Sequence, residues 1–472
     1  MNREKNLLKN TLIITVGRVC TQLVTFLLLP LYTGILTTEE YGVVDLLNTL
    51  VSLLLPIVTF QIEQAVFREM IEVRNNDDAE KGKIITSGIL FVGFQCLLYV
   101  LFFLIISPFI HNEYKIFLVT NVIAYIFSSL FLQISRGFGD NNKYAIASFI
   151  SAFSTIVFNI LLLVVISLRA SGMLIGTFLG QLLCIVFLFI FLKLYKYIKL
   201  SYFDKNVLKK LLKYSIPLVP NAISWWVFNT SDRVIVSAML GLSANGLLSA
   251  ASKFSVVYIT FYNIFNMSWT ESISLHIHDI DIKDYFNKTM NIVLKIFVSM
   301  AVLMIAFMPF VYRIMINKKF IGGYNLIPIL TVASLFNVIV GLISVIYIAN
   351  KNTKAVANTS IISAVLNIMV HIILIRVVGL YAAAISTFVS FFAMSIFRIY
   401  DINKRYFKII IEKRNVIVSL IMLLFVTVSY YVNNLYLNVF TIIISLIYSV
   451  LSNKSSIHYI LKFFKLKKQI IK

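Results

Sequence analysis

Fourteen long apolar stretches dominate this sequence and leave little choice of fold. The chain has 472 residues, of which 60% are hydrophobic and 13% are charged. A helix crosses a bilayer core with about 20 largely apolar residues. Stretches of that length fall at residues 10–33, 43–66, 84–106, 116–134, 146–168, 172–192, 214–240, 245–267, 289–310, 326–348, 356–375, 379–397, 416–432 and 435–452. The sequence therefore predicts an all-α polytopic membrane protein with about 14 transmembrane helices.

The net charge of +22 is concentrated in alternate connecting segments. With the N-terminus placed inside, 32 of the 42 Lys and Arg residues fall on that side of the membrane and six fall on the other. Such a bias orients membrane proteins with their basic segments in the cytoplasm. The pattern predicts that both termini are cytoplasmic, and it argues against a nucleic-acid partner.

The first apolar helix, residues 7–31, carries a charge well inside it, Arg18. Gln22 and three threonines lie at helical spacing with it, so these polar side chains share one face. An arginine at the centre of a bilayer costs about 2.5–3.5 kcal/mol on insertion scales, so it should face protein or water. We expect this helix to form one wall of a polar cavity that carries a fixed cation.

The second span has a polar face with an acid at each end, Asp45 and Glu63. The face continues between them at steps of three or four residues, through Asn48, Ser52, Pro56 and Thr59. Helix ends tolerate charge, so the simpler interpretation places both acids at the membrane interfaces.

Further polar residues interrupt later spans. Asn229, Asp232 and Arg233 lie in the seventh span, and Lys253 lies about eight residues into the eighth. Asp232 and Arg233 could neutralise each other, or Arg233 could contact a substrate. An ionisable residue inside a span is by default a candidate for function.

The eleventh span places Asn367 and His371 on one face. A membrane histidine is a candidate proton relay because its unperturbed pKa is near physiological pH, although a hydrogen-bonded packing role is the commoner case. Cys20, Cys96 and Cys184 show no metal-ligand spacing, and the sequence has no nucleotide-binding or hydrolase motif. The sequence therefore gives no case for an enzyme, a metal or a cofactor.

Short matches at nearly constant offset suggest an internal repeat. Tyr41-Gly42 corresponds to Asn245-Gly246 at an offset of 204, and Phe158-Asn159-Ile160 corresponds to Leu366-Asn367-Ile368 at 208. Six spans per repeat return the chain to the same side, so the two halves would be parallel and could rock about a central site. The predicted domains are a six-helix lobe at 1–192, a basic linker at 193–213, a second six-helix lobe at 214–399, and a C-terminal region at 400–472. The C-terminal region holds a basic linker, two extra helices and a basic tail.

Three segments carry a family resemblance. Asn10–Arg18 (NTLIITVGR), Leu29–Gly42 (LPLYTGILTTEEYG) and Asn229–Val236 (NTSDRVIV) resemble the multidrug/oligosaccharidyl-lipid/polysaccharide (MOP) exporter superfamily. Within it the Wzx-type polysaccharide flippases are the most similar branch. The two extra C-terminal helices also occur in lipid II flippases of this superfamily.

The resemblance implies a MATE-like V of two six-helix lobes working by alternating access in the bacterial cytoplasmic membrane. The implied substrate is an undecaprenyl-pyrophosphate-linked oligosaccharide, moved from the inner to the outer leaflet for capsule, O-antigen or another surface polymer. Membrane lipids, a polysaccharide polymerase and a chain-length regulator would be its partners.

The residues help to choose among branches of the superfamily. Drug-exporting relatives typically use an acid in the first helix, whereas this chain has Arg18 there, which suits a pyrophosphate. The candidate substrate contacts are Arg18, Gln22, Asn48, Asn229, Arg233, Lys253 and Asn367. The candidates for coupling to H⁺ or Na⁺ are Asp45, Glu63, Asp232 and His371. The alternatives are a cation-coupled drug antiporter, a lipid II-type flippase, a membrane scaffold, and a polymerase, which should have a longer outer loop.

Overall fold

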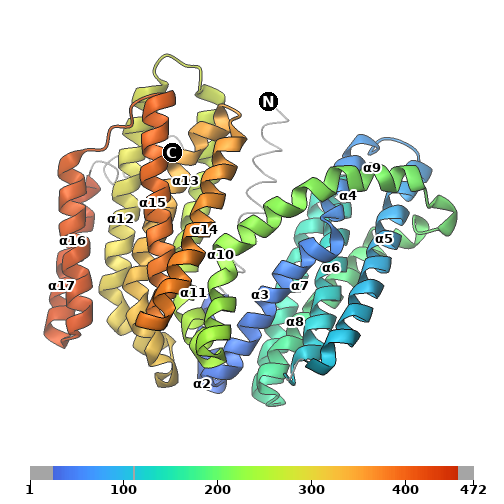
Figure 1. Ribbon diagram of the computed structural model, residues 1–472, viewed down its shortest axis with the longest axis horizontal. Coiled ribbons are helices and arrows are strands. Elements are labelled where there is room, and N and C mark those ends of the chain that lie inside the picture. The colour runs from blue at the N-terminus through green and yellow to red at the C-terminus, as the bar shows by residue number, and fades with distance from the viewer. Residues whose placement is uncertain (1–24, 110–111, 455–472) are drawn as a thin grey trace, which may run out of the picture. The chain divides into compact units, whose positions relative to one another are not determined.

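The computed structural model describes residues 25–109 and 112–454 of the chain (Figure 1). Within these residues the fold is entirely helical, with sixteen α-helices. Eleven of the helical segments are long and apolar enough to cross a membrane. The predicted all-α membrane architecture is therefore confirmed. Residues 10–24 of the first predicted span, with Arg18 and Gln22 among them, lie outside the described residues.

The chain forms two compact units, the first ending at Gly246 and the second beginning at Leu247. The helices of unit 1 are α2 (Leu29–Ile35), α3 (Thr38–Thr59), α4 (Ile62–Glu72), α5 (Asp78–Ile106), α6 (Lys115–Phe138), α7 (Asn141–Ile160), α8 (Arg169–Phe191), α9 (Lys205–Ser215) and α10 (Val219–Leu240). Helix α11 (Leu242–His276) begins in unit 1 and continues into unit 2. The other helices of unit 2 are α12 (Ile282–Met315), α13 (Ile327–Ala349), α14 (Thr353–Val378), α15 (Tyr381–Arg405), α16 (Lys413–Val432) and α17 (Leu435–Ser452).

Each predicted span from the third to the fourteenth overlaps a described helix. Helices α10 and α11 occupy the predicted seventh and eighth spans but are not among the eleven candidates. Both carry several polar residues, including Asn229, Arg233 and Lys253. Two membrane-length helices therefore have lower hydropathy than the rest.

The second predicted span, 43–66, is broken in the structure. Helix α3 ends at Thr59, and both Phe60 (φ 49°) and Gln61 (φ 58°) adopt the left-handed conformation before α4 begins. That conformation is uncommon for residues other than glycine and is concentrated at functional or constrained sites. Pro56 lies within α3 and supplies no N–H to its hydrogen-bond ladder, although the helix continues to Thr59. Glu63 therefore lies on α4, beyond the break.

The predicted basic linker forms α9 and packs its apolar face on unit 1. Leu211 of α9 is fully buried, and the Thr86 hydroxyl of α5 donates a hydrogen bond (2.6 Å) to the carbonyl of Tyr197. Lys210 forms an ion pair with Glu69 of α4. These contacts fix the linker to α4 and α5.

The two extra C-terminal helices pack on α12 (Figure 1). The segment between α15 and α16 is extended along α12, where the side-chain amide of Asn287 bonds to the backbone of Lys408 and Ile410. Asn291 does the same with Ile410 and Glu412. The two asparagine side chains thus donate to and accept from the extended backbone, as a neighbouring strand would, and fix the connection to α16 on α12.

Helices α3 and α11 cross in backbone contact at two glycines. A Cβ on Gly42 would lie 1.9 Å from the carbonyl oxygen of Leu242, and a Cβ on Gly246 would lie 1.9 Å from that of Thr38. The side-chain amide of Asn245 also donates to the carbonyl of Gly42 (2.9 Å). Gly42 and Gly246 are 204 residues apart, and so are Thr38 and Leu242, which is the offset found in the sequence. The two contacts are therefore equivalent, and the crossing is locally symmetric.

We expect Gly42→Ala to destabilise the protein by about 1–3 kcal/mol or more, because its methyl group would overlap a backbone oxygen that has no room to move. Thermal unfolding in lipid nanodiscs would measure the loss. The matched control is Gly93→Ala in α5, where nothing lies within 4 Å of the added Cβ. Equal stability of the two variants would contradict this interpretation of the crossing.

Candidate functional site

The predicted site residues fall into two groups, one in each unit. Asp45, Asn48, Glu63, Asn229, Asp232 and Arg233 belong to unit 1, whereas Lys253, Asn367 and His371 belong to unit 2. That all of them line one cavity remains a prediction. No group of three His, Cys, Asp or Glu residues within the described chain is arranged to hold a metal.

An ion pair joins α3 and α10. The Nε atom of Arg233 lies 2.9 Å from Oδ2 of Asp45, and the two side chains are 21% and 13% exposed. The two atoms lack the alignment of a hydrogen bond, so the contact is a close pairing of charges. Each group neutralises the other within the membrane-length part of unit 1.

Exposed amides lie along the same two helices. Asn48 of α3 and Asn229 of α10 are both exposed. The amide nitrogen of Asn229 donates to the carbonyl of Trp225 (2.8 Å), which leaves its oxygen as an acceptor. The indole of Trp226 donates to the carbonyl of Thr49 and the hydroxyl of Ser52, both at 3.0 Å, and so ties α10 to α3. Unit 1 therefore presents neutral hydrogen-bonding groups beside a paired charge.

Two predicted residues of α14 are buried. Asn367 is 1% exposed and His371 is 0% exposed, one helical turn apart. In this conformation Asn367 offers no surface to a substrate. Lys253 of α11 is half-buried, and Asp232 of α10 is half-buried as well.

Arg398 of α15 is a buried cation that the sequence analysis missed. Its side chain is 2% exposed, and its guanidinium donates to the hydroxyl of Thr359 (3.0 and 2.7 Å) and to that of Ser360 (3.2 Å) on α14. It also donates to the Ser344 hydroxyl on α13 and to the carbonyl of Val356. One arginine thus ties three helices together through neutral acceptors.

A sequence signal for Arg398 did exist. The apolar run of the predicted twelfth span ends at residue 397, so the sequence alone places Arg398 in the connecting segment that follows. It nevertheless continues the buried face of α15, which carries Ser390 and Met394 at helical spacing. Beside it, Asp401 accepts a hydrogen bond from Tyr347 (2.8 Å) and pairs with Arg405 (2.7 Å).

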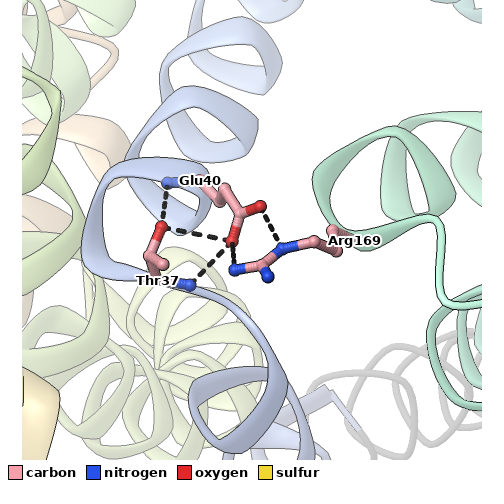
Figure 2. A network of polar contacts seen from close by, with 3 residues as sticks. All are labelled: Thr37, Glu40 and Arg169. Carbon is pink, nitrogen blue, oxygen red and sulfur yellow. Dashed lines mark hydrogen bonds and ion pairs between the residues drawn. The ribbon is translucent and has the colours of Figure 1, made fainter.

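The family-like segment Leu29–Gly42 forms a structural corner in unit 1. Figure 2 shows Thr37 capping α3, with its hydroxyl accepting from the N–H of Glu40 (3.2 Å) and its own N–H donating to Glu40 (2.8 Å). Arg169, the first residue of α8, pairs with the same carboxylate. Glu40 therefore completes a capping box and anchors a second helix, so its role here is structural.

Asp45→Asn should lower the free energy of unfolding by on the order of 2 kcal/mol, because it leaves the Arg233 charge without its partner in a poorly solvated place. The exchanged pair Asp45→Arg with Arg233→Asp should recover more than half of that loss. Arg68→Gln, in an exposed pair with Glu72, is the control and should change stability little. If the exchanged pair is as unstable as the sum of its single variants, the two groups do not interact.

Arg398→Lys should cost about 2 kcal/mol of stability, because one ammonium group cannot reach hydroxyls on two helices from the position of a planar guanidinium. Chemical unfolding in detergent micelles would measure the change. Arg405→Lys is the matched control on the same helix, since Arg405 is 58% exposed and has one carboxylate partner. A similar cost at both positions would show that Arg398 does not brace the three helices.

Comparison with known proteins extends these observations. The sequence model of a family described as "Polysaccharide biosynthesis protein" matches residues 7–274. A search of curated proteins returned no match.

Two solved structures share the fold. One, titled lipid II flippase MurJ in an inward closed conformation, has a TM-score of 0.68 at 18% identity, covering 96% of this chain and 99% of that one. The other is an inward-facing multidrug resistance MATE family transporter of the MOP superfamily. It has a TM-score of 0.67 at 12% identity, covering 82% of this chain and 99% of that one. At these identities the likeness shows the fold alone.

Proposed function

Because the chain belongs to the polysaccharide biosynthesis protein family, we propose that it is a flippase for lipid-linked oligosaccharides. It would move an undecaprenyl-pyrophosphate-linked repeat unit from the inner to the outer leaflet of the bacterial cytoplasmic membrane. The match of the family model to residues 7–274 carries this proposal. The protein would act as a transporter and would catalyse no covalent chemistry.

The extent of the structural match supports a flippase for a lipid-linked substrate. The lipid II flippase comparison leaves out 4% of the chain, about 19 of 472 residues. Helices α16 and α17 together hold twice that number, with 20 and 18 residues. The match therefore extends into the C-terminal pair, as expected of a fold with two helices beyond the two six-helix lobes. In this proposal the chain has fourteen transmembrane helices and both termini in the cytoplasm.

The exposed amides of unit 1 fit an oligosaccharide head group. Asn48 and Asn229 lie within membrane-length helices, where an exposed polar side chain needs water or a ligand. Amides both donate and accept hydrogen bonds, as sugar hydroxyls require. Arg18 would supply the charge for the pyrophosphate, and the lipid tail would stay in the bilayer.

A cation-coupled drug antiporter is the second candidate, because a MATE transporter shares the fold. Such a protein would need an accessible acid to exchange a cation for a drug. Asp45 is paired with Arg233, and Glu63 is 2% exposed. Asp45 is therefore not available to a drug cation in this conformation, and together with the family match this favours the flippase.

Arg18→Ala should abolish surface polymer in a strain that lacks the gene, whereas Arg18→Lys should partly restore it, because a cation is needed for an anionic head group. Polymer is scored at equal membrane abundance, together with the lipid-linked repeat unit that accumulates in the inner leaflet. Normal polymer with Arg18→Ala would remove the cationic site, and drug resistance conferred by the protein would favour the antiporter.

The double variant Asn48→Leu with Asn229→Leu should reduce export by about tenfold, which corresponds to the loss of one or two hydrogen bonds to the substrate. Asn206→Leu on α9 is the control, since Asn206 is exposed but lies outside the membrane-length helices. An unchanged export rate in the double variant would exclude these amides from substrate binding.

A further inference from the structure

Glu63 is an acid buried without a counter-charge in unit 1. Its side chain is 2% exposed and lies among the fully buried residues Ile62, Ala65 and Val66 of α4. Its Oε2 atom has no hydrogen-bond partner. An ionised carboxylate is not stable in such a place unless it is paired, so the structure fits a neutral, protonated acid.

The neighbouring threonine supports the same protonation state. Among the described residues, Thr59 is the side chain that hydrogen-bonds toward the carboxyl group, beside the N–H of Glu63 itself. Its single hydroxyl proton is already donated to the carbonyl of Leu55 (2.9 Å), while its oxygen accepts from the N–H of Gln61 (3.1 Å). The hydroxyl can stabilise an anionic Glu63 only by leaving Leu55, which would alter the end of α3.

No ionisable group on the described elements packed against α4 forms an ion pair with Glu63. Lys210 of α9 pairs with Glu69 and Glu72, and Arg136 of α6 stacks over Phe67 and donates to Gln133. The remaining ionisable groups of α3, α5, α6 and α9 are Glu39, Glu40, Asp45, Asp78, Glu80, Lys81, Lys83, Cys96, Tyr99, Lys115, Tyr125, Lys205, Lys209, Lys213, Tyr214 and the buried Tyr41. Among the described residues, none adds a charge effect at Glu63, and burial raises the pKa of this acid, which lies beyond the end of the span in α3.

The break between α3 and α4 brings the surface of unit 1 close to this buried acid. Phe60 is 36% exposed and Gln61 is half-buried, so the chain is accessible two residues from Glu63. Both residues are left-handed, a conformation that persists only where the surroundings hold it. The N-terminus of α4 would partly stabilise the anion, so proton release is costly but not forbidden.

We propose that Glu63 is a proton-binding site that is protonated in this conformation and releases its proton to water at the α3–α4 break during transport. The O–H bond of the acid breaks, a water molecule takes the proton, and the carboxylate takes the Thr59 hydroxyl and the first N–H groups of α4. Proton occupancy and the shape of the break are thereby linked. The role in transport rests on the proposed flippase function, whereas proton binding does not.

The first test measures proton binding directly in the full-length protein in nanodiscs. Infrared difference spectra against pH should show a protonated-carboxyl band that persists above the range of ordinary glutamates in the wild type and in Glu72→Gln. The band should be missing from Glu63→Gln, which keeps the shape of the neutral acid. Glu72 is on the same helix but half-exposed and paired, so it is the matched control. A band of equal size in Glu63→Gln would overturn the proposal.

The second test uses proteoliposomes loaded with a lipid-linked oligosaccharide. The wild-type rate should change by up to about tenfold per pH unit on the flank of its profile, as for a single titrating group. Glu63→Gln should vary by less than about twofold over the same range. A wild-type profile in Glu63→Gln would overturn the role in transport. If the wild-type protein moves no substrate at any pH, the flippase proposal fails, and the infrared spectra still decide whether Glu63 binds a proton.

Discussion

Unit 1 depends on a contact between two backbones that side chains would prevent. Gly42 and Gly246 bring α3 and α11 so close that each faces a carbonyl oxygen of the other helix. This contact places α11 beside α3, and Asn245 adds a hydrogen bond to it. Because membrane helices gain little from burying apolar surface against each other, close backbone packing and hydrogen bonds carry much of their association. Thr37 and Glu40 lie next to this crossing in the sequence, and Arg169 of α8 pairs with Glu40 there.

The buried charges follow two different solutions to the same energetic problem. Arg233 is paired with an acid across two helices, whereas Arg398 keeps its charge and distributes it over hydroxyls and a carbonyl. The first arrangement is neutral, and the second leaves a positive field in unit 2. Glu63 is a third case, in which protonation removes the charge altogether. In the proposed transport cycle the charges of Arg233 and Arg398 stay constant, whereas the charge of Glu63 changes with its protonation.

The sequence was sufficient for the helices but not for the partners of their polar groups. Apolar length predicted the later helices, eleven of which are long and apolar enough to cross a membrane, because burial in lipid requires apolar side chains along each helix separately. Asp45 and Arg233 form an ion pair although they are 188 positions apart. The periodicity of one helix cannot predict which residue of another helix its side chains contact. The break after Thr59 was missed because Phe60 and Gln61 carry none of the usual signals for a left-handed residue. Arg398 was missed because it lies one residue past the apolar run that defines its helix.

The asparagine pair on α12 has a consequence for the order in which unit 2 is completed. Asn287 and Asn291 are almost fully buried, yet their amides bond to backbone groups made 119 to 123 residues later in the chain. During synthesis these amides must wait, hydrated or unpaired, until the segment before α16 emerges. The hydrogen bonding of α12 is therefore completed only when residues 408–412 have been made. A chimera or truncation that keeps α12 must also keep residues 408–412, even if it discards both helices that follow.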